Sequence, residues 1–342
     1  MPRLLAAPDK FRGTATAGEV AGAVRRAATS CGWTADAVPL SDGGDGLLAV
    51  LDPGSSRLRV TEVTGPNGAK VPAPWLLTGS TAVIELARAS GLALAGGPGR
   101  NDPLAATTRG TGELMVAAAR AVGDGGTVVV GLGGSASTDG GLAALEAVEE
   151  QGGLGDVELV GAYDVRALFV EAAGRFAPQK GATPADVELL RARLGRLAER
   201  YLETYGVDVR SEPGAGAAGG MGGAIMALGG HLESGYRLVA GILGLDDALR
   251  RADLVVTGEG ALDASSFTGK VVGGVVGDAA ALGVPVLVVA GRVGTDGREI
   301  ARGAGGTVVE VVSLTDRYGE ALAVGGTIAC VEAVVGEVLG SR

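Results

Sequence analysis

The sequence predicts an α/β protein of two domains, a Rossmann-like parallel-sheet domain with a second α/β domain inserted in it. Short apolar runs alternate with longer alanine-rich segments of helical periodicity, which is typical of parallel strands joined by helices. The chain has 342 residues, enough for about two domains of roughly 150 residues each. Predicted strands and helices alternate regularly in the first and last parts of the chain, and less regularly in its middle. We therefore expect residues 1–60 and 250–342 to form the discontinuous Rossmann-like domain and residues 61–249 the inserted one.

The elements follow in chain order from the same patterns. The apolar runs predict strands at Leu4–Ala7, Ala35–Leu40, Ala82–Leu86, Thr127–Leu132, Glu158–Ala162, Leu254–Thr257, Val284–Ala290 and Thr307–Val312. The alanine-rich segments predict helices after Thr16 and at Gly112–Val122, Leu142–Glu150, Asp186–Tyr205, Thr268–Ala281 and Gly319–Leu339. Glycine-rich segments between these elements predict loops, and they lie at Ser41–Gly46, Gly133–Gly141, Gly214–Gly223 and Gly258–Asp263.

Two helix ends are marked by their sequence. Thr16 and Glu19 have the spacing of a capping box, which predicts a helix start. Gly123 follows an apolar-periodic segment and predicts a C-terminal cap.

Composition excludes several classes of function. The formal net charge is −10 and aromatic residues make up 3% of the chain, so we expect neither a nucleic-acid partner nor an anionic membrane partner. Two cysteines and one histidine are too few for a disulfide framework or a zinc site. A single histidine also argues against a Ser-His-Asp mechanism as the chemistry of this chain, and we assign His231 no role. The first residues do not resemble a signal peptide, so we expect a cytoplasmic protein.

Acidic residues recur just after predicted strands, each close to glycine or proline. They are Asp9, Asp42, Asp139, Asp164, Glu259 and Asp263. Ligands of open α/β sheets bind at the carboxyl ends of the strands, and converging carboxylates suit Mg²⁺ or a general base. The alternative is that Asp and Gly are simply good turn residues.

Lysine is rare in this chain. The 29 basic residues include only four lysines, and three of them, Lys10, Lys180 and Lys270, lie in predicted loops. A compact ammonium group suits phosphate as a point charge. The alternative is that these three lysines have no special role and simply remain in a chain whose composition favours arginine. We expect Lys70 to be a surface turn residue.

Glycine loops that follow strands present backbone N–H groups to anions. Gly133–Gly141 has this form and adds the hydroxyls of Ser135, Ser137 and Thr138. Gly214–Gly219 reads G-x-G-x-x-G, but residues 207–213 carry three charges and are a poor buried strand. A second anion loop or close helix packing is therefore favoured over NAD binding.

Several of these segments also match motifs of a known family, in order and along nearly the whole chain. They are Ala7–Phe11, Asp42–Gly46, Ile84–Ala87, Ser90–Leu92, Asp102–Leu114, Gly133–Gly141, Phe176–Ala182, Gly214–Gly222, and Thr257–Asp263 with Gly269 and Lys270. With these segments the chain resembles the bacterial glycerate kinases that phosphorylate the 2-hydroxyl group.

The resemblance implies that ATP and D-glycerate react to ADP and 2-phosphoglycerate with Mg²⁺. Asp42 or Asp139 would orient and deprotonate the hydroxyl, and the sequence does not rank them. Lys10, Lys180 or Lys270 would hold the migrating phosphates, with Lys10 and Lys270 as catalytic candidates. Glu259 or Asp263 would hold Mg²⁺, and Arg109 would clamp the substrate carboxylate. The other residues expected to bind substrate or nucleotide are Asp9, Gly133, Gly134, Ser135, Thr138, Asp164, Gly216 and Gly219.

The sequence also departs from the family pattern. An Asn-Pro-Leu-x-Gly stretch usual between Asp164 and Phe176 is absent, the family's Arg is Ala261, and its Asn is Thr138. These departures concern substrate contacts, so a kinase of the same fold that acts on another small hydroxy acid is also compatible with the sequence. A dehydrogenase is a weaker candidate, as is a non-catalytic relative that binds anions. A homodimer is compatible with the sequence.

Overall fold

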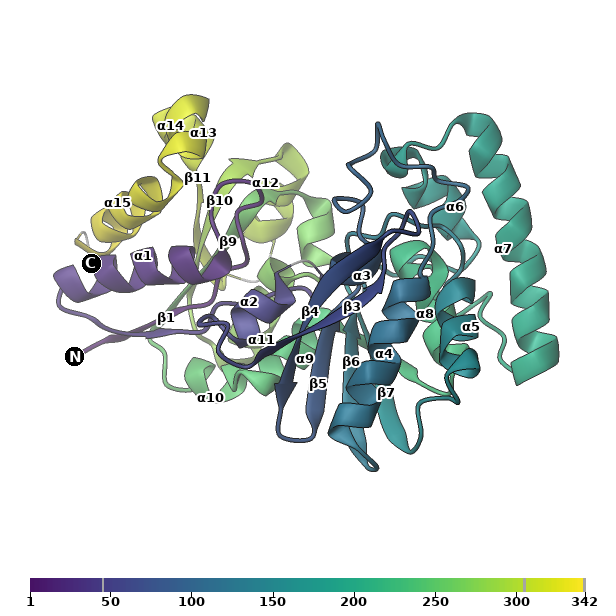
Figure 1. Cartoon of the computed structure of the whole chain (residues 1–342). Coiled ribbons are helices and arrows are strands. Elements are labelled where there is room, and N and C mark those ends of the chain that lie inside the picture. The colour runs from purple at the N-terminus through teal and green to yellow at the C-terminus, as the bar shows by residue number, and fades with distance from the viewer. Residues whose placement is uncertain (45, 304–305, 341–342) are drawn as a thin grey trace. The chain divides into compact units, whose positions relative to one another are not determined.

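The computed structural model describes residues 1–44, 46–303 and 306–340, and it divides the chain into two compact units. Unit 1 comprises Met1–Asp42 and Tyr236–Arg342, and unit 2 comprises Gly43–Gly235. Both units are α/β (Figure 1).

The sheet of unit 1 has five parallel strands in the order β11-β10-β9-β1-β2. The strands are β1 (Arg3–Ala6), β2 (Thr34–Ala37), β9 (Leu254–Leu262), β10 (Val286–Val293) and β11 (Val308–Ser313). β9, β1 and β2 are neighbours, so residues far apart in the sequence meet at one edge of this sheet.

The helices of this part of the chain follow in order. They are α1 (Ala17–Ser30), α9 (Gly235–Ile242), α10 (Leu245–Leu249), α11 (Val271–Leu282), α12 (Thr295–Arg302), α13 (Leu314–Tyr318), α14 (Glu320–Gly325) and α15 (Thr327–Gly340), with a 3₁₀ turn, η2, at Ala264–Phe267. α1 and α15 lie side by side (Figure 1) and bury Val20, Val24 and Val331 against Leu4 and Val256 of the sheet. The capping box at Thr16 and Glu19 is confirmed.

The sheet of unit 2 has six strands in the order β3-β4-β5-β6-β7-β8. They are β3 (Leu58–Thr64), β4 (Lys70–Thr78), β5 (Thr81–Glu85), β6 (Gly126–Gly131), β7 (Val157–Tyr163) and β8 (His231–Ser234). β3, β4 and β5 pair antiparallel, and β5 through β8 pair parallel.

The helices of unit 2 place its loops. They are α2 (Leu47–Leu51), α3 (Ala87–Ser90), α4 (Arg109–Val122), α5 (Leu142–Glu150), α6 (Glu171–Phe176), α7 (Pro184–Tyr205) and α8 (Ala217–Ala227), with a 3₁₀ turn, η1, at Pro178–Lys180. Gly123 ends α4 with φ +75°, so the predicted C-terminal cap is confirmed. Among the described residues, no helix is long and apolar enough to span a membrane.

The structure places the joins between the units after Asp42 and after Gly235, whereas the sequence pattern predicts them at 60/61 and 249/250. β3 pairs with β4 in the second sheet, so the chain joins unit 2 before residue 58. At the other join, Tyr236 donates a hydrogen bond to Asp278 of α11 (2.7 Å), so residues 236–249 belong with unit 1.

Three loop or helix predictions are wrong in part. Gly258–Leu262 is not a loop, because β9 continues through it and pairs with β10. A Cβ at Gly258 would lie 1.8 Å from the Val289 carbonyl oxygen, so glycine is what lets these strands approach. Most of the predicted loop Gly214–Gly223, from Ala217 onward, belongs to α8. The single predicted C-terminal helix is divided at Gly326 into α14 and α15.

Candidate active site

Three carboxylates lie at the carboxyl edge of the sheet in unit 1. Asp9 follows β1, Asp42 follows β2, and Glu259 lies within β9. Burial raises the pKa of Asp9 to about 7, helped by the charges of Asp42 and Glu259 and opposed by Lys10. Burial also raises the pKa of Glu259. The charge of Asp42 thus disfavours the ionised forms of both Asp9 and Glu259, and a positive charge beside these two groups would be stabilising.

Glu259 meets a further test for a cation. It is buried, and its Oε1 atom has no hydrogen-bond partner among the described residues. A buried carboxylate oxygen without a partner is costly, and a hard cation such as Mg²⁺ would satisfy it. No three His, Cys, Asp or Glu side chains in the described parts of the chain are close enough to hold a metal alone. Mg²⁺ commonly binds with one or two protein carboxylates, substrate phosphates and water, so Glu259 and its neighbours fit that ion.

Asp263, the other predicted metal ligand, has a different environment. Its Oδ1 atom accepts hydrogen bonds from the amide and hydroxyl of Ser265 (2.8 and 2.6 Å), and the residue caps η2. The Ser265 hydrogen bond lowers the pKa of Asp263. Lys270 donates to the same Ser265 hydroxyl (3.0 Å). Asp263 therefore positions this turn, and Glu259 is the stronger metal candidate.

Lys10 lies next to the carboxylates. Its backbone amide donates to Asp9 Oδ1 (2.7 Å), and its charge lowers the pKa of Asp9. Six predicted residues of unit 1, namely Asp9, Lys10, Asp42, Glu259, Asp263 and Lys270, thus lie in one electrostatically connected group. Asp45, in the predicted motif after Asp42, lies outside the described residues.

The glycine loop Gly133–Gly141 of unit 2 follows β6 and is fastened by a buried lysine. Lys180 donates from Nζ to the Ser135 hydroxyl (2.7 Å) and to the Ser137 carbonyl oxygen. Burial lowers the pKa of Lys180 to about 7, and Asp139 opposes the shift. These two acceptors thus occupy two of the N–H donors of the Lys180 side chain. Lys180 therefore holds the Gly133–Gly141 loop in place through these two hydrogen bonds.

Two hydroxyls of this loop lack a hydrogen-bond partner in the part of the chain that the structure describes. Ser137 Oγ and Thr138 Oγ1 are buried and make no hydrogen bond to any residue that the structure describes. Buried hydroxyls normally have partners, so these two are available to a ligand. Gly133 and Gly134 precede them, and Gly134 is exposed.

The second glycine segment packs against the first. Gly216 donates to the Ala167 carbonyl (3.0 Å), and the Gly219 carbonyl accepts from the Gly140 amide (3.0 Å). Ala218, Gly219 and Gly220 all have positive φ and kink α8 at its start. Residues 207–213 are not a strand, so the G-x-G-x-x-G sequence lacks the strand that a dinucleotide site requires.

Asp139 is held by its own chain. Its Oδ2 atom accepts from the Thr108 amide (2.9 Å) and hydroxyl (2.7 Å), and Oδ1 accepts from the Gly141 amide (3.1 Å). The two bonds from Thr108 join the loop to the start of α4, and the bond from Gly141 lies within the loop. Asp164 directly follows β7 and is half-buried.

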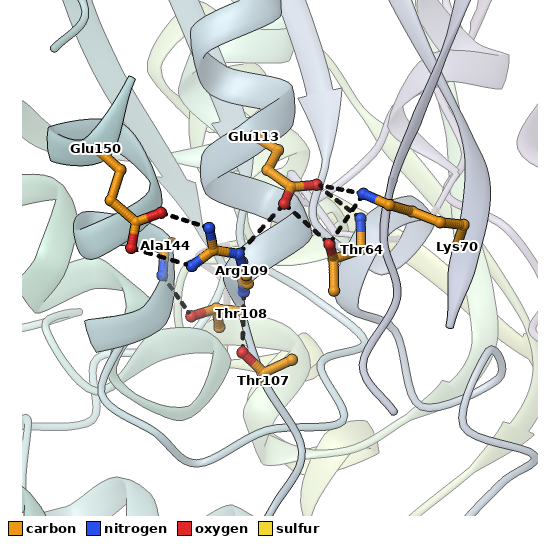
Figure 2. Close-up of polar contacts among 8 residues, drawn as sticks. All are labelled: Thr64, Lys70, Thr107, Thr108, Arg109, Glu113, Ala144 and Glu150. Atoms are coloured by element: carbon orange, nitrogen blue, oxygen red, sulfur yellow. Dashed lines mark hydrogen bonds and ion pairs between the residues drawn. The ribbon is translucent and has the colours of Figure 1, made fainter. Parts of the chain in front are cut away.

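Arg109 lies in an ion-pair network on α4 (Figure 2). Its guanidinium makes a two-pronged contact with Glu150 and an ion pair with Glu113 (3.4 Å). Glu113 in turn accepts from the amide and hydroxyl of Thr64 (2.7 and 2.9 Å), and Lys70 also approaches it. The Arg109 guanidinium already pairs with two carboxylates of the protein, which does not suit its predicted role of binding the substrate carboxylate.

A pocket of about 370 Å³ in unit 2 is not among the sequence predictions. Its lining includes three arginines of α7, at positions 193, 196 and 200, beside a leucine stripe. The sequence does contain a trace of this pocket, because the three arginines have i, i+3, i+7 spacing. The same spacing is typical of a solvated helix face, so it does not predict a pocket.

Known proteins match nearly the whole chain. The model of the glycerate kinase family matches residues 4–152 and 149–327. The chain belongs to the glycerate kinase family. A glycerate 2-kinase of Escherichia coli K12 is 37% identical over 332 residues, covering 86% of each chain. An uncharacterised protein of Mycobacterium bovis is 40% identical over 336 residues, covering 93% of this chain and 85% of the other.

A solved structure agrees with the fold of this glycerate kinase family member. The crystal structure of a protein described as a glycerate kinase 2 from Salmonella typhimurium LT2 has a TM-score of 0.81 and 31% sequence identity, covering 99% of this chain and 98% of the other. The predicted family and the two-domain α/β class are confirmed.

Proposed function

We propose that this protein is an ATP-dependent glycerate 2-kinase that converts D-glycerate to 2-phosphoglycerate and requires Mg²⁺. The observation that supports this most is the group of Asp9, Asp42 and Glu259 at adjacent strand ends, in a chain that the glycerate kinase family matches along most of its length. A sugar-acid hydroxyl needs a base, and a migrating phosphoryl group needs positive charge.

Asp42 is the proposed base. The 2-hydroxyl oxygen attacks the γ-phosphorus, its proton passes to an Asp42 carboxylate oxygen, and ADP leaves. Asp42 is preferred to Asp139 because the Asp139 carboxylate already accepts two hydrogen bonds from Thr108 and one from Gly141, which gives it a structural role. Lys10 and Lys270 would offset the negative charge of the transferring group.

Glu259, with Asp9, is proposed to hold Mg²⁺. When bound, the ion would neutralise phosphate charge and orient the phosphoryl group. Glu259 contributes a buried oxygen that has no partner among the described residues, and Asp9 contributes a neighbouring carboxylate whose charge the cation would stabilise. In unit 2, the Gly133–Gly141 loop is proposed to bind phosphate through its amides and the Ser137 and Thr138 hydroxyls, with Lys180 as a positioning residue.

The test is ADP release by the full-length protein with Mg-ATP and D-glycerate, compared with L-glycerate, glycolate and tartronate. Saturable turnover confined to D-glycerate is expected. Turnover of a different acid would instead favour the second candidate, a kinase of the same fold for another hydroxy acid, for which the altered 164–176 segment and Ala261 are the sequence arguments. No turnover with any acid would contradict both.

A Mg²⁺ titration in the same assay tests the metal site. Glu259→Gln should raise the Mg²⁺ concentration needed for half-maximal activity by about tenfold or more. Glu310→Gln is the matched control, because Glu310 is an exposed residue of β11 in the same sheet. Equal Mg²⁺ dependence in the two variants would remove Glu259 from the metal site.

A further inference from the structure

The lining of the unit 2 pocket has an apolar part and a charged part. The apolar part includes the leucine stripe of α7, formed by the buried side chains of Leu190, Leu194 and Leu197, and also Leu104. Thr138 and Asp139, at the end of the glycine loop, also line it. The volume is about 370 Å³, within the range of small-molecule sites. A three-carbon acid would leave most of this space unfilled.

The rim of the pocket is positively charged, although the whole chain has a net charge of −10. Arg193, Arg196 and Arg200 stand at i, i+3 and i+7 on α7 and line the pocket together. Arg193 donates to the Leu104 carbonyl (3.0 Å), and Arg200 is 3.7 Å from Glu146. Within the described chain, Arg196 makes no hydrogen bond or ion pair, so its guanidinium is available to an anion.

An independent observation also indicates a ligand. Thr138 is 1% exposed, lines the pocket, and its hydroxyl has no partner among the described residues. Asp139 is the acidic group of the lining, but its carboxylate accepts three hydrogen bonds from the protein, which offsets part of its charge.

We propose that this pocket binds the nucleoside triphosphate donor, with the base against the leucine stripe and the phosphates toward Arg196. The inference rests on the proposed function and adds α7 to the residues that bind the donor. An aromatic base fits an apolar wall, and guanidinium groups pair well with phosphate. Because Thr138 and Asp139 belong to the glycine loop, the pocket is continuous with the loop proposed to bind phosphate.

Calorimetric titration of the full-length protein with Mg-ATP tests the arginine rim. Arg196→Glu should raise the Kd by about tenfold or more, because an attractive contact becomes repulsive. Arg191→Glu is the matched control, since it makes the same charge change on the same helix outside the pocket lining and loses only an exposed pair with Glu188. It should change the Kd less than about twofold. Equal effects of the two variants would overturn the proposal.

A second measurement tests the apolar wall. The unmodified protein should bind Mg-ATP more tightly than inorganic tripolyphosphate. Leu104→Trp, which fills the pocket, should weaken Mg-ATP binding and leave tripolyphosphate binding unchanged. Equal affinity of the unmodified protein for both ligands would show that no base is bound and would overturn the proposal.

Steady-state kinetics separate this inference from the proposed function. For Arg196→Glu, the KM for ATP should rise while the KM for D-glycerate stays the same. If D-glycerate is phosphorylated but the KM for ATP is unchanged, the pocket assignment fails and the proposed function stands. If no acid is phosphorylated, the proposed function fails, and the ATP titrations still decide whether the pocket binds a nucleotide.

Discussion

Asp42 and Asp139 are each followed by two glycines in the sequence, but their carboxylates have different surroundings. Asp42 is half-buried, and its charge raises the pKa of Asp9. The Asp139 carboxylate accepts three hydrogen bonds from Thr108 and Gly141. The first is proposed to be a base, and the second holds a loop.

The two Asp-to-Asn variants should therefore fail in different ways. Asp42→Asn should lower kcat by about 10²–10⁴-fold and leave ATP affinity nearly intact. Asp139→Asn should lower the free energy of unfolding by about 1–3 kcal/mol, because hydrogen bonds to a charged acceptor are lost. Kinetics and urea unfolding measure both. A fall of only two- or threefold in kcat for Asp42→Asn would exclude it as the base.

Lys180 gives a prediction for pH. Its pKa in the folded protein is lowered to about 7 by burial, whereas an unfolded lysine titrates near 10.4. Between these values the unfolded chain binds one more proton, so this residue makes the free energy of unfolding rise with pH, by about 1.4 kcal/mol per unit. The contribution is smallest below pH 7, where the folded protein must bury the charged amine.

Urea unfolding at pH 7 and pH 9 tests this sign. The stability of the unmodified protein relative to Lys180→Met should increase at the higher pH. Lys70→Met is the control and should show no such change, because Lys70 is exposed. If the unmodified protein and Lys180→Met change in parallel, Lys180 is charged in the folded protein.

At the scale of elements, the kink at the start of α8 is the feature that most constrains the glycine loops. Gly219 has φ +76°, and a Cβ there would lie 2.2 Å from the Ser137 carbonyl oxygen and 3.0 Å from Lys180 Nζ. Gly219→Ala should therefore lower the free energy of unfolding by about 3 kcal/mol through strain and displacement of the loop.

Gly195→Ala is the matched substitution. Gly195 lies within α7, and nothing lies within 4 Å of a Cβ placed there. Alanine should stabilise the helix by about 0.5–1 kcal/mol. Urea unfolding of the two variants gives the comparison, and similar effects would show that the kink is not needed.

The sequence predicts the elements with a clear period and misses those without one. The parallel strands β1, β5, β6, β7, β9 and β10 are largely buried apolar runs, and the sequence predicts them. β8 is short and half-buried, and no apolar run predicts it. β4 was missed because Pro72 and Pro74 argue against a strand interior. In the structure its pairing with β5 begins only at Trp75, and both prolines pair with β3 on the other side.

The site residues likewise divide into those that a local sequence pattern predicts and those that it does not. Post-strand carboxylates could be predicted because strand ends meet at one edge of a parallel sheet. The partners of Arg109 could not, because Glu150 is 41 residues away and no local pattern joins them. The burial of Lys180 could not be predicted from the sequence either, because it depends on two glycine segments that pack together only in the folded protein.

At the scale of the whole molecule, the chain combines a discontinuous unit with a continuous one. Each unit contains one group of predicted residues. Four of the predicted carboxylates and two lysines lie in unit 1, namely Asp9, Asp42, Glu259, Asp263, Lys10 and Lys270. The glycine loops, Asp139, Asp164, Lys180 and the α7 pocket lie in unit 2. We propose that unit 1 supplies the base and the metal ligands and that unit 2 binds the nucleotide.

We propose that this chain transfers the γ-phosphoryl group of ATP to the 2-hydroxyl of D-glycerate. Phosphorus NMR of a reaction with the full-length protein, Mg-ATP and D-glycerate tests it most directly. Phosphate on carbon 2 couples to one proton and gives a doublet, whereas phosphate on carbon 3 couples to two and gives a triplet. We expect a new doublet that grows with ADP and depends on Mg²⁺. A triplet would contradict the assigned hydroxyl, and the absence of any new phosphomonoester would contradict the proposed kinase activity.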